Sequence, residues 1–119
     1  MSILRSGGTN YIGVQNLAAA TAWYKGKLNL REITIELEDG EDCIALGFST
    51  GDFALVLGPA GKPTDEPNAL LFTSNINKAR DFLSSRGVNT GEIQQDRAGT
   101  RYFEMHDLEG NMIEVSEEP

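Results

Sequence analysis

The sequence predicts an α+β fold made of two β-α-β-β-β modules, and three observations lead to this prediction. The segment NYIGVQNLAAATAWYKGKLNL, residues 10–30, is echoed by ALLFTSNINKARDFLSSRGVN, residues 69–89. In each segment an alternating apolar pattern runs into an asparagine, and a helical pattern follows. Three strand candidates then follow each helix. Self-similarity at a fixed offset indicates that one supersecondary unit occurs twice.

Two asparagines mark the expected helix starts, because an asparagine side chain accepts a hydrogen bond from the first free helical N–H groups. Asn16 and Asn75 predict helices over residues 17–27 and 76–86. We expect the first helix to bury Ala20, Trp23 and Leu28, and we interpret Trp23 and Tyr24 as core or helix-face residues. The second helix carries one apolar face and ends at Arg86-Gly87; that face consists of Ile76, Ala79, Phe82 and Leu83.

The strand candidates divide evenly between two modules of one domain that spans residues 1–119. The first module, residues 7–58, contributes REITIEL, CIALGF and FALVLG, and the second, residues 68–117, contributes VNTGEIQ, RYFEMH and NMIEVS. The linker 59–67 lies in a stretch rich in proline and glycine, which break strands and helices. One module alone is too small to be stable. We therefore expect the pair to form a curved mixed sheet around a concave cavity, with helices on its outer face.

Composition and charge exclude several classes of partner. A formal charge of −8 opposes phosphate backbones, so we expect no nucleic-acid partner. No apolar run approaches the roughly 20 residues of a membrane span, and the N-terminal residues do not resemble a signal peptide. The single cysteine, Cys43, cannot form an internal disulfide, which favours a cytoplasmic location. No phosphate loop, nucleotide fingerprint, zinc spacing or Ser-His-Asp arrangement is visible.

Two segments carry a resemblance to a known family. The helix segment NLAAATAWYKGKLNL and the closing segment HDLEGNMIEV resemble the vicinal oxygen chelate superfamily of glyoxalases, extradiol dioxygenases, and fosfomycin- and bleomycin-resistance proteins. The closing segment is similar to the family signature Asp-Pro-Asp-Gly-Asn-x-Ile-Glu, with Leu108 where proline is usual. The resemblance covers nearly the whole chain. It implies the fold and leaves the function open.

The resemblance also implies where metal-dependent members hold their metal. Transferred one by one, the four ligand positions are Thr9, Val56, Asn68 and Glu114. Only the glutamate has the expected ligand type, since valine has no lone pair and neutral threonine or asparagine oxygens are poor ligands for a transition metal. A catalytic metal normally needs about three protein ligands. We therefore expect no metal cofactor at the usual position.

Strand alternation predicts which side chains face the cavity. Ile113 and Val115 need the core beneath the helices, which turns Met112 and Glu114 to the concave face. The same argument applied to RYFEMH directs three side chains into the cavity, namely Tyr102, Glu104 and His106.

The turn Leu108-Glu109-Gly110 brings Glu104 opposite Glu114 in the predicted hairpin. Two facing carboxylates repel each other unless a shared proton, a basic side chain, His106 or a bound cation compensates. One interpretation is an acid–base or cation-binding site. The alternative is a wide, solvated face that merely tolerates the pair, with His106 half-exposed beside the turn.

The rest of the predicted cavity wall is apolar. Ile44, Leu46 and Phe48 match the positions of Tyr102, Glu104 and His106 in the other module. Together with the polar wall, this suits an amphiphilic organic ligand. The predicted ligand-binding residues are Tyr11, Leu46, Phe48, Leu70, Phe72, Tyr102 and Met112.

Three functional hypotheses remain open at this point. The first is a metal-free small-molecule-binding protein of the glyoxalase/bleomycin-resistance type. The second is an enzyme, of lyase, isomerase or dioxygenase type, in which Glu114, Glu104 and His106 act as acid–base groups or hold one divalent metal ion. The third is a dimeric module with a vestigial cavity. We also expect a homodimer, because open sheet edges are commonly protected by symmetric pairing.

Overall fold

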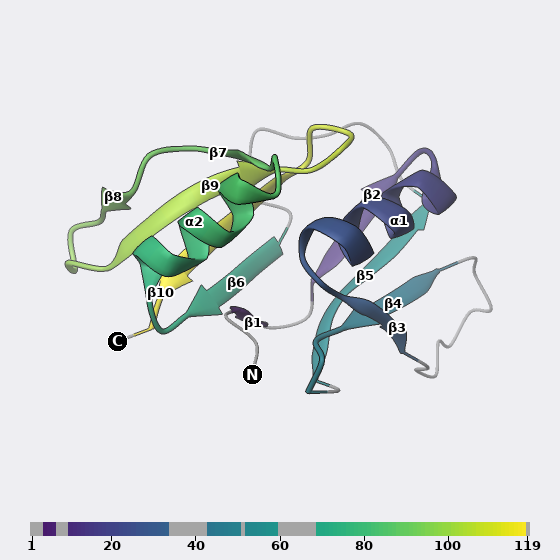
Figure 1. Cartoon of the computed structure of the whole chain (residues 1–119), viewed down its shortest axis with the longest axis horizontal. Helices are drawn as coiled ribbons and strands as arrows, with labels where there is room; N and C mark the ends of the chain where they lie inside the picture. The colour runs from purple at the N-terminus through teal and green to yellow at the C-terminus, as the bar shows by residue number, and fades with distance from the viewer. Residues whose placement is uncertain (1–3, 7–9, 34–42, 51, 60–68, 119) are drawn as a thin grey trace.

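Two mixed β-sheets, each with one helix on the same side, make up the described part of the chain (Figure 1). This computed structural model describes residues 4–6, 10–33, 43–50, 52–59 and 69–118. The predicted α+β class and the two helices are confirmed. Among the described residues the strands form two hydrogen-bonded sheets.

The first sheet, here called the N-terminal sheet, has the strand order β2-β5-β4-β3. Its β2–β5 pair is parallel, and its other two pairs are antiparallel. A parallel pair needs a crossover connection, and here that connection contains the helix. Of the predicted strand REITIEL, residues 34–37 lie outside the described residues. The elements are β2 (Tyr11–Val14), α1 (Leu17–Lys27), β3 (Arg31–Ile33), β4 (Ile44–Gly47) and β5 (Phe53–Pro59).

The second sheet, the C-terminal sheet, has the order β1-β6-β10-β9-β7, with β8 also paired to β9. Its β10–β6 pair is parallel and repeats the arrangement of the first sheet. The N-terminal strand β1, which the sequence analysis does not predict, pairs antiparallel with β6. The elements are β1 (Leu4–Ser6), β6 (Ala69–Thr73), α2 (Ile76–Ser85), β7 (Asn89–Thr90), β8 (Gln94–Gln95), β9 (Arg101–His106) and β10 (Met112–Glu117).

Both predicted helix caps are present. The Asn16 side-chain oxygen accepts from the Ala19 N–H at 3.0 Å, and the Asn75 oxygen accepts from the Lys78 N–H at 3.1 Å. The second helix ends at Ser85, one residue before the predicted end, and Arg86 is its C-cap. No helix of the described residues is long and apolar enough to cross a bilayer.

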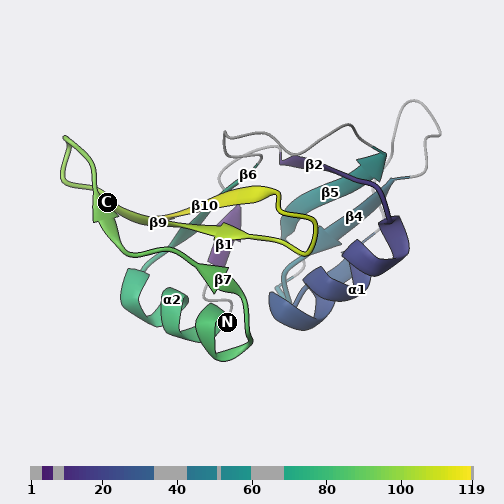
Figure 2. The same ribbon diagram turned by 90° about the horizontal axis from the view of Figure 1, so that it is seen from above.

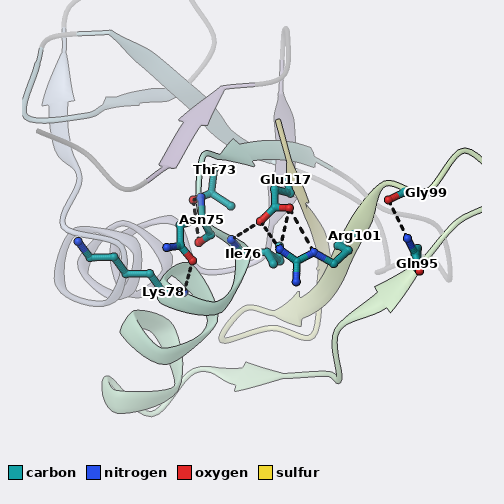
Figure 3. Close-up of polar contacts among 8 residues, drawn as sticks. All are labelled: Thr73, Asn75, Ile76, Lys78, Gln95, Gly99, Arg101 and Glu117. Carbon is teal, nitrogen blue, oxygen red and sulfur yellow. Dashed lines mark hydrogen bonds and ion pairs between the residues drawn. The ribbon is translucent and has the colours of Figure 1, made fainter. Parts of the chain in front are cut away.

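A carboxylate from the last strand reinforces the start of α2 (Figure 3). Glu117 accepts from the Ile76 N–H at 2.9 Å and forms an ion pair with Arg101 at 2.9 Å. The backbone hydrogen bond from Ile76, followed by the hydrogen bond from Arg101, lowers the pKa of Glu117. This contact ties the helix to both strands of the C-terminal hairpin.

The core lies between the helices and the sheets. Tyr24 is fully buried, whereas Trp23 is half-buried. The two rings meet edge to face, with their centroids 4.9 Å apart. Trp23 is therefore a helix-face residue that packs against the core, and Tyr24 is the aromatic that α1 buries fully. Both helices lie on one side of the two sheets, which leaves the opposite side without a helix (Figure 2). We call that opposite side the open face of each sheet.

Leu46 does not lie on the open face, and its place in the predicted ligand-binding wall is wrong. Leu46 pairs with Leu55, and Leu46, Leu55 and Phe48 all belong to the buried core. The residue that pairs with Val56 is Ala45, as Glu104 pairs with Glu114 in the other sheet. The equivalence between modules is thus shifted by one residue, and a shift of one residue reverses the face.

Asn10 connects the two sheets where their first strands approach each other. Its side-chain N–H group donates to the Ala54 carbonyl of β5 and to the Leu70 carbonyl of β6, both at 3.1 Å. Its side-chain oxygen accepts from the Leu70 N–H, also at 3.1 Å. Because Asn10 is buried, these bonds are shielded from water and hold the edge of one sheet against the other.

Candidate functional site

The open face of the C-terminal sheet presents two rows of side chains across three neighbouring strands. Strand pairing places Leu70, Glu114 and Glu104 in one row, from β6 through β10 to β9. The adjacent row consists of Phe72, Ser116 and Tyr102. The predicted hairpin register, with Glu104 opposite Glu114, is therefore confirmed.

Burial alternates along these strands as the sequence predicts. Phe103, Met105, Ile113 and Val115 are fully buried on the helix side. The side chains of the open face are half-buried, apart from the more deeply buried Ser116. Apolar and acidic groups therefore share a partly desolvated surface; its half-buried members are Leu70, Phe72, Tyr102, Glu104, His106, Met112 and Glu114.

The two central carboxylates face each other across paired strands. Glu114 accepts a hydrogen bond from the Ser116 hydroxyl at 3.1 Å. Among the described residues, neither Glu104 nor Glu114 forms an ion pair. Directly opposed like charges destabilise a strand pair, and a ligand that carries a positive charge or a strong hydrogen-bond donor would relieve this repulsion.

The other polar groups of this face lie at its two ends. His106 pairs with Met112 beside the hairpin turn, two residues beyond Glu104 along β9. At the other end the Tyr102 hydroxyl donates a long hydrogen bond to the Gln94 side-chain oxygen at 3.4 Å.

The residues present do not fit the family's metal site. Val56 of β5 occupies the position equivalent to Glu114 and cannot bind a metal. Two further positions, Thr9 and Asn68, lie outside the described residues. Within residues that the structure describes, no three His, Cys, Asp or Glu side chains are close enough to hold a metal ion, and this includes Glu104, His106 and Glu114.

Tyr11 is the aromatic residue that the N-terminal sheet adds to the open side. It is 46% exposed, and its hydroxyl donates to the Pro59 carbonyl at 2.9 Å. The ring needs the space left by Gly58, since a Cβ there would collide with the Tyr11 hydroxyl and with the Cys43 sulfur. Tyr11 adjoins Asn10, whose side chain contacts Leu70, so the two open faces meet near these residues.

A buried polar cluster at the hairpin turn is not apparent from the sequence. The Tyr24 hydroxyl donates to Asp107 Oδ2 at 2.6 Å, and the Asn111 side chain donates to the same oxygen at 3.1 Å. Burial first, and the adjacent Asp107 second, raise the pKa of Tyr24 well above its usual value. The Asp-x-x-Gly pattern indicates a turn, but no local signal indicates a partner 83 residues away.

The sequence matches one family over most of its length. The family described as "Glyoxalase/Bleomycin resistance protein/Dioxygenase superfamily" matches residues 8–115. No curated protein sequence matches the chain. This match agrees with the resemblance inferred from the helix segment and the closing hairpin.

Solved structures share the fold at low sequence identity. A superfamily member from Sphaerobacter thermophilus DSM 20745 is 20% identical, with a TM-score of 0.75 and coverage of 92% of this chain and 94% of that one. FosX, a fosfomycin resistance protein from Listeria monocytogenes, is 13% identical, with a TM-score of 0.66 and coverage of 94% and 92%. TioX from Micromonospora sp. ML1 is 16% identical, with a TM-score of 0.63 and coverage of 96% and 97%. At these identities the likeness shows the fold alone.

Proposed function

We propose that this chain, which belongs to the Glyoxalase/Bleomycin resistance protein/Dioxygenase superfamily, binds a small amphiphilic organic molecule on the open face of its C-terminal sheet. One observation carries the proposal, namely the in-register row of Leu70, Glu114 and Glu104 beside the row of Phe72, Ser116 and Tyr102. Apolar area next to a few fixed polar groups is the usual chemistry of a small-molecule site.

Each part of this face has a distinct role in the proposed binding. Leu70 and Phe72 supply the apolar area against which the body of the ligand packs. Glu104 and Glu114 accept hydrogen bonds from a cationic or proton-donating group of the ligand, and that group offsets the repulsion between them. Tyr102 limits the face at one end and can donate to a polar ligand atom.

The proposed binding is independent of metal. The support is the donor set, because Val56 cannot act as a ligand and the described acidic and histidine side chains do not converge on one point. Affinity should therefore be equal in the presence and absence of a chelator such as EDTA. One divalent metal ion per chain that is lost in Glu114→Gln would contradict this part of the proposal.

A matched pair of leucine substitutions tests the location of the site. Aromatic amines, aromatic alcohols and aromatic carboxylates of similar size are screened by thermal shift, and the dissociation constant of the tightest compound is measured by calorimetry. Leu70→Ala should weaken binding roughly tenfold, which corresponds to about 1.4 kcal/mol. Leu108→Ala, at an exposed leucine of the β9–β10 turn outside the two rows, should leave binding unchanged.

The acidic pair gives the second arm of the test. We expect amines to bind more tightly than alcohols, and carboxylates to bind least. Glu104→Gln should weaken amine binding by about 1–3 kcal/mol. No binding from any of the three compound classes, or equal losses in Leu70→Ala and Leu108→Ala, would overturn the proposed site.

A further inference from the structure

The turn between β9 and β10 contacts the other module at several points. Its first residue, Asp107, accepts from the Tyr24 hydroxyl in the middle of α1. Its third residue, Glu109, accepts from the N–H groups of Gln15 at 2.8 Å and Asn16 at 3.0 Å, where α1 begins. Asn111 donates to the Gly13 carbonyl of β2 at 3.2 Å.

The centre of this contact is a fully satisfied buried carboxylate. Asp107 Oδ1 accepts from the N–H groups of Glu109 at 2.9 Å and Asn111 at 2.8 Å. Asp107 Oδ2 accepts from the Tyr24 hydroxyl and from the Asn111 side chain. A carboxylate has about four acceptor sites, so all of them are used. The three side chains are buried, with Tyr24 at 0%, Asp107 at 8% and Asn111 at 2% exposure.

The polar contacts between the ends of the two helices are exposed, unlike this buried cluster. Lys27 donates to the Arg86 carbonyl at 2.6 Å, and Arg86 donates to the Gly26 carbonyl at 3.0 Å, but both bonds are exposed. Exposed polar contacts exchange readily with water and contribute little. A buried, fully satisfied network tolerates few alternative geometries.

The turn connects this buried cluster to the two strands that carry Glu104 and Glu114. Asp107 follows His106 directly, and Asn111 precedes Met112 directly, so the turn carries the ends of both strands of the acidic row. A change in the turn's position against α1 therefore changes the position of Glu104 and Glu114 relative to the N-terminal sheet.

We propose that Tyr24 and Asp107 are positioning residues that fix the orientation of the two modules within a single chain. Through the hydrogen bond between them, helix α1 sets the orientation of the C-terminal hairpin. The open faces of the two sheets are then held in one fixed arrangement before any ligand binds. This inference goes beyond the proposed function and holds whatever the face binds.

A distance measurement between the helices tests the inference without a ligand. In a Cys43→Ser background, cysteines at Ala18 and Asp81, both exposed, carry one spin label on each helix. Double electron–electron resonance on the full chain should give one narrow distance distribution. Tyr24→Phe, which removes only the hydroxyl, should broaden or shift that distribution. Tyr102→Phe is the matched control, since among the described residues its hydroxyl bonds to Gln94 of the same sheet.

A purely stabilising role would leave the distances unchanged in every variant that folds. Far-UV circular dichroism shows whether each variant keeps its secondary structure. Asp107→Asn should broaden the distribution more than Tyr24→Phe does. It replaces one carboxylate oxygen by an amide NH2 group, which cannot accept the two hydrogen bonds that this oxygen receives. If Tyr24→Phe folds and gives the same distribution as the parent and Tyr102→Phe, the inference is wrong, whether or not Asp107→Asn folds.

Discussion

The Tyr24→Phe substitution should change how stability depends on alkaline pH. The phenol is buried and donates to Asp107, and burial with this neighbouring carboxylate raises its pKa well above 10.0. In the unfolded chain Tyr24 loses its proton near pH 10, whereas in the folded chain it keeps the proton. The unfolded state then binds fewer protons, so stability falls as pH rises above about 10.

The magnitude of this effect follows from the geometry and the linkage relation. At neutral pH, loss of a hydrogen bond to a charged acceptor costs about 1.5–3 kcal/mol, and we expect the lower end because Asp107 retains three other donors. Between the unfolded and folded pKa values, the proton of Tyr24 contributes a slope of about 1.4 kcal/mol per pH unit. The stabilisation is complete below the unfolded pKa and is lost as pH rises toward the folded pKa.

Urea unfolding at intervals from pH 7 to pH 11 measures both quantities. The informative quantity is the difference in unfolding free energy between the parent chain and Tyr24→Phe, because every other ionisable group is common to both chains. That difference should be constant up to about pH 10 and then shrink. Tyr102→Phe should run parallel to the parent. A Tyr24→Phe curve that runs parallel to the parent up to pH 11 would show that the phenol does not keep its proton as argued.

Three further predictions concern acid stability, the acidic pair and assembly. Glu117, whose pKa is lowered by Ile76 and Arg101, should stabilise the fold above its unfolded value near 4.5, and the contribution should disappear as pH falls through the folded pKa. Urea unfolding of Glu117→Gln between pH 3 and pH 7 should therefore show a weaker acid dependence than the parent. Glu104→Gln should stabilise the ligand-free chain by about 0.2–1 kcal/mol in the same assay at pH 7, because it removes a facing like charge; a loss of stability would contradict this. We also propose a homodimer, and sedimentation equilibrium at micromolar concentration that gives only the 13.0 kDa chain mass would argue against it.

Local signals were sufficient for most of the fold. Asn16 and Asn75 cap the helices as predicted, because an N-cap is decided by residues three positions apart. The Glu104–Glu114 pairing also follows from short-range information, since a tight turn and one buried face fix the register of a hairpin. The half of the site that lies on this hairpin can therefore be predicted from the sequence.

Long-range contacts account for what the sequence did not reveal. Strand β1 forms only because β6 offers it an edge, and three residues carry no strand pattern of their own. The sequence comparison puts Leu46 on the wrong face because it assumes one constant offset between the two modules. The register shift between Leu46 and Gly47 changes which residues of the two modules correspond. The bonds of Asp107 to Tyr24 and of Asn10 to Leu70 join residues more than 50 positions apart, and each depends on the final packing of the modules.

Amide NMR mapping of the bound compound tests the proposed site most directly. The ¹H–¹⁵N spectrum is recorded during titration with the tightest aromatic amine from the screen, with and without EDTA. We expect the largest saturable shifts at residues of the two open-face rows, including Leu70, Phe72, Glu104 and Glu114, and we expect the same shifts in Leu108→Ala. Saturable shifts that are confined to the helices or to the N-terminal sheet, with these rows unaffected, would contradict the proposed site.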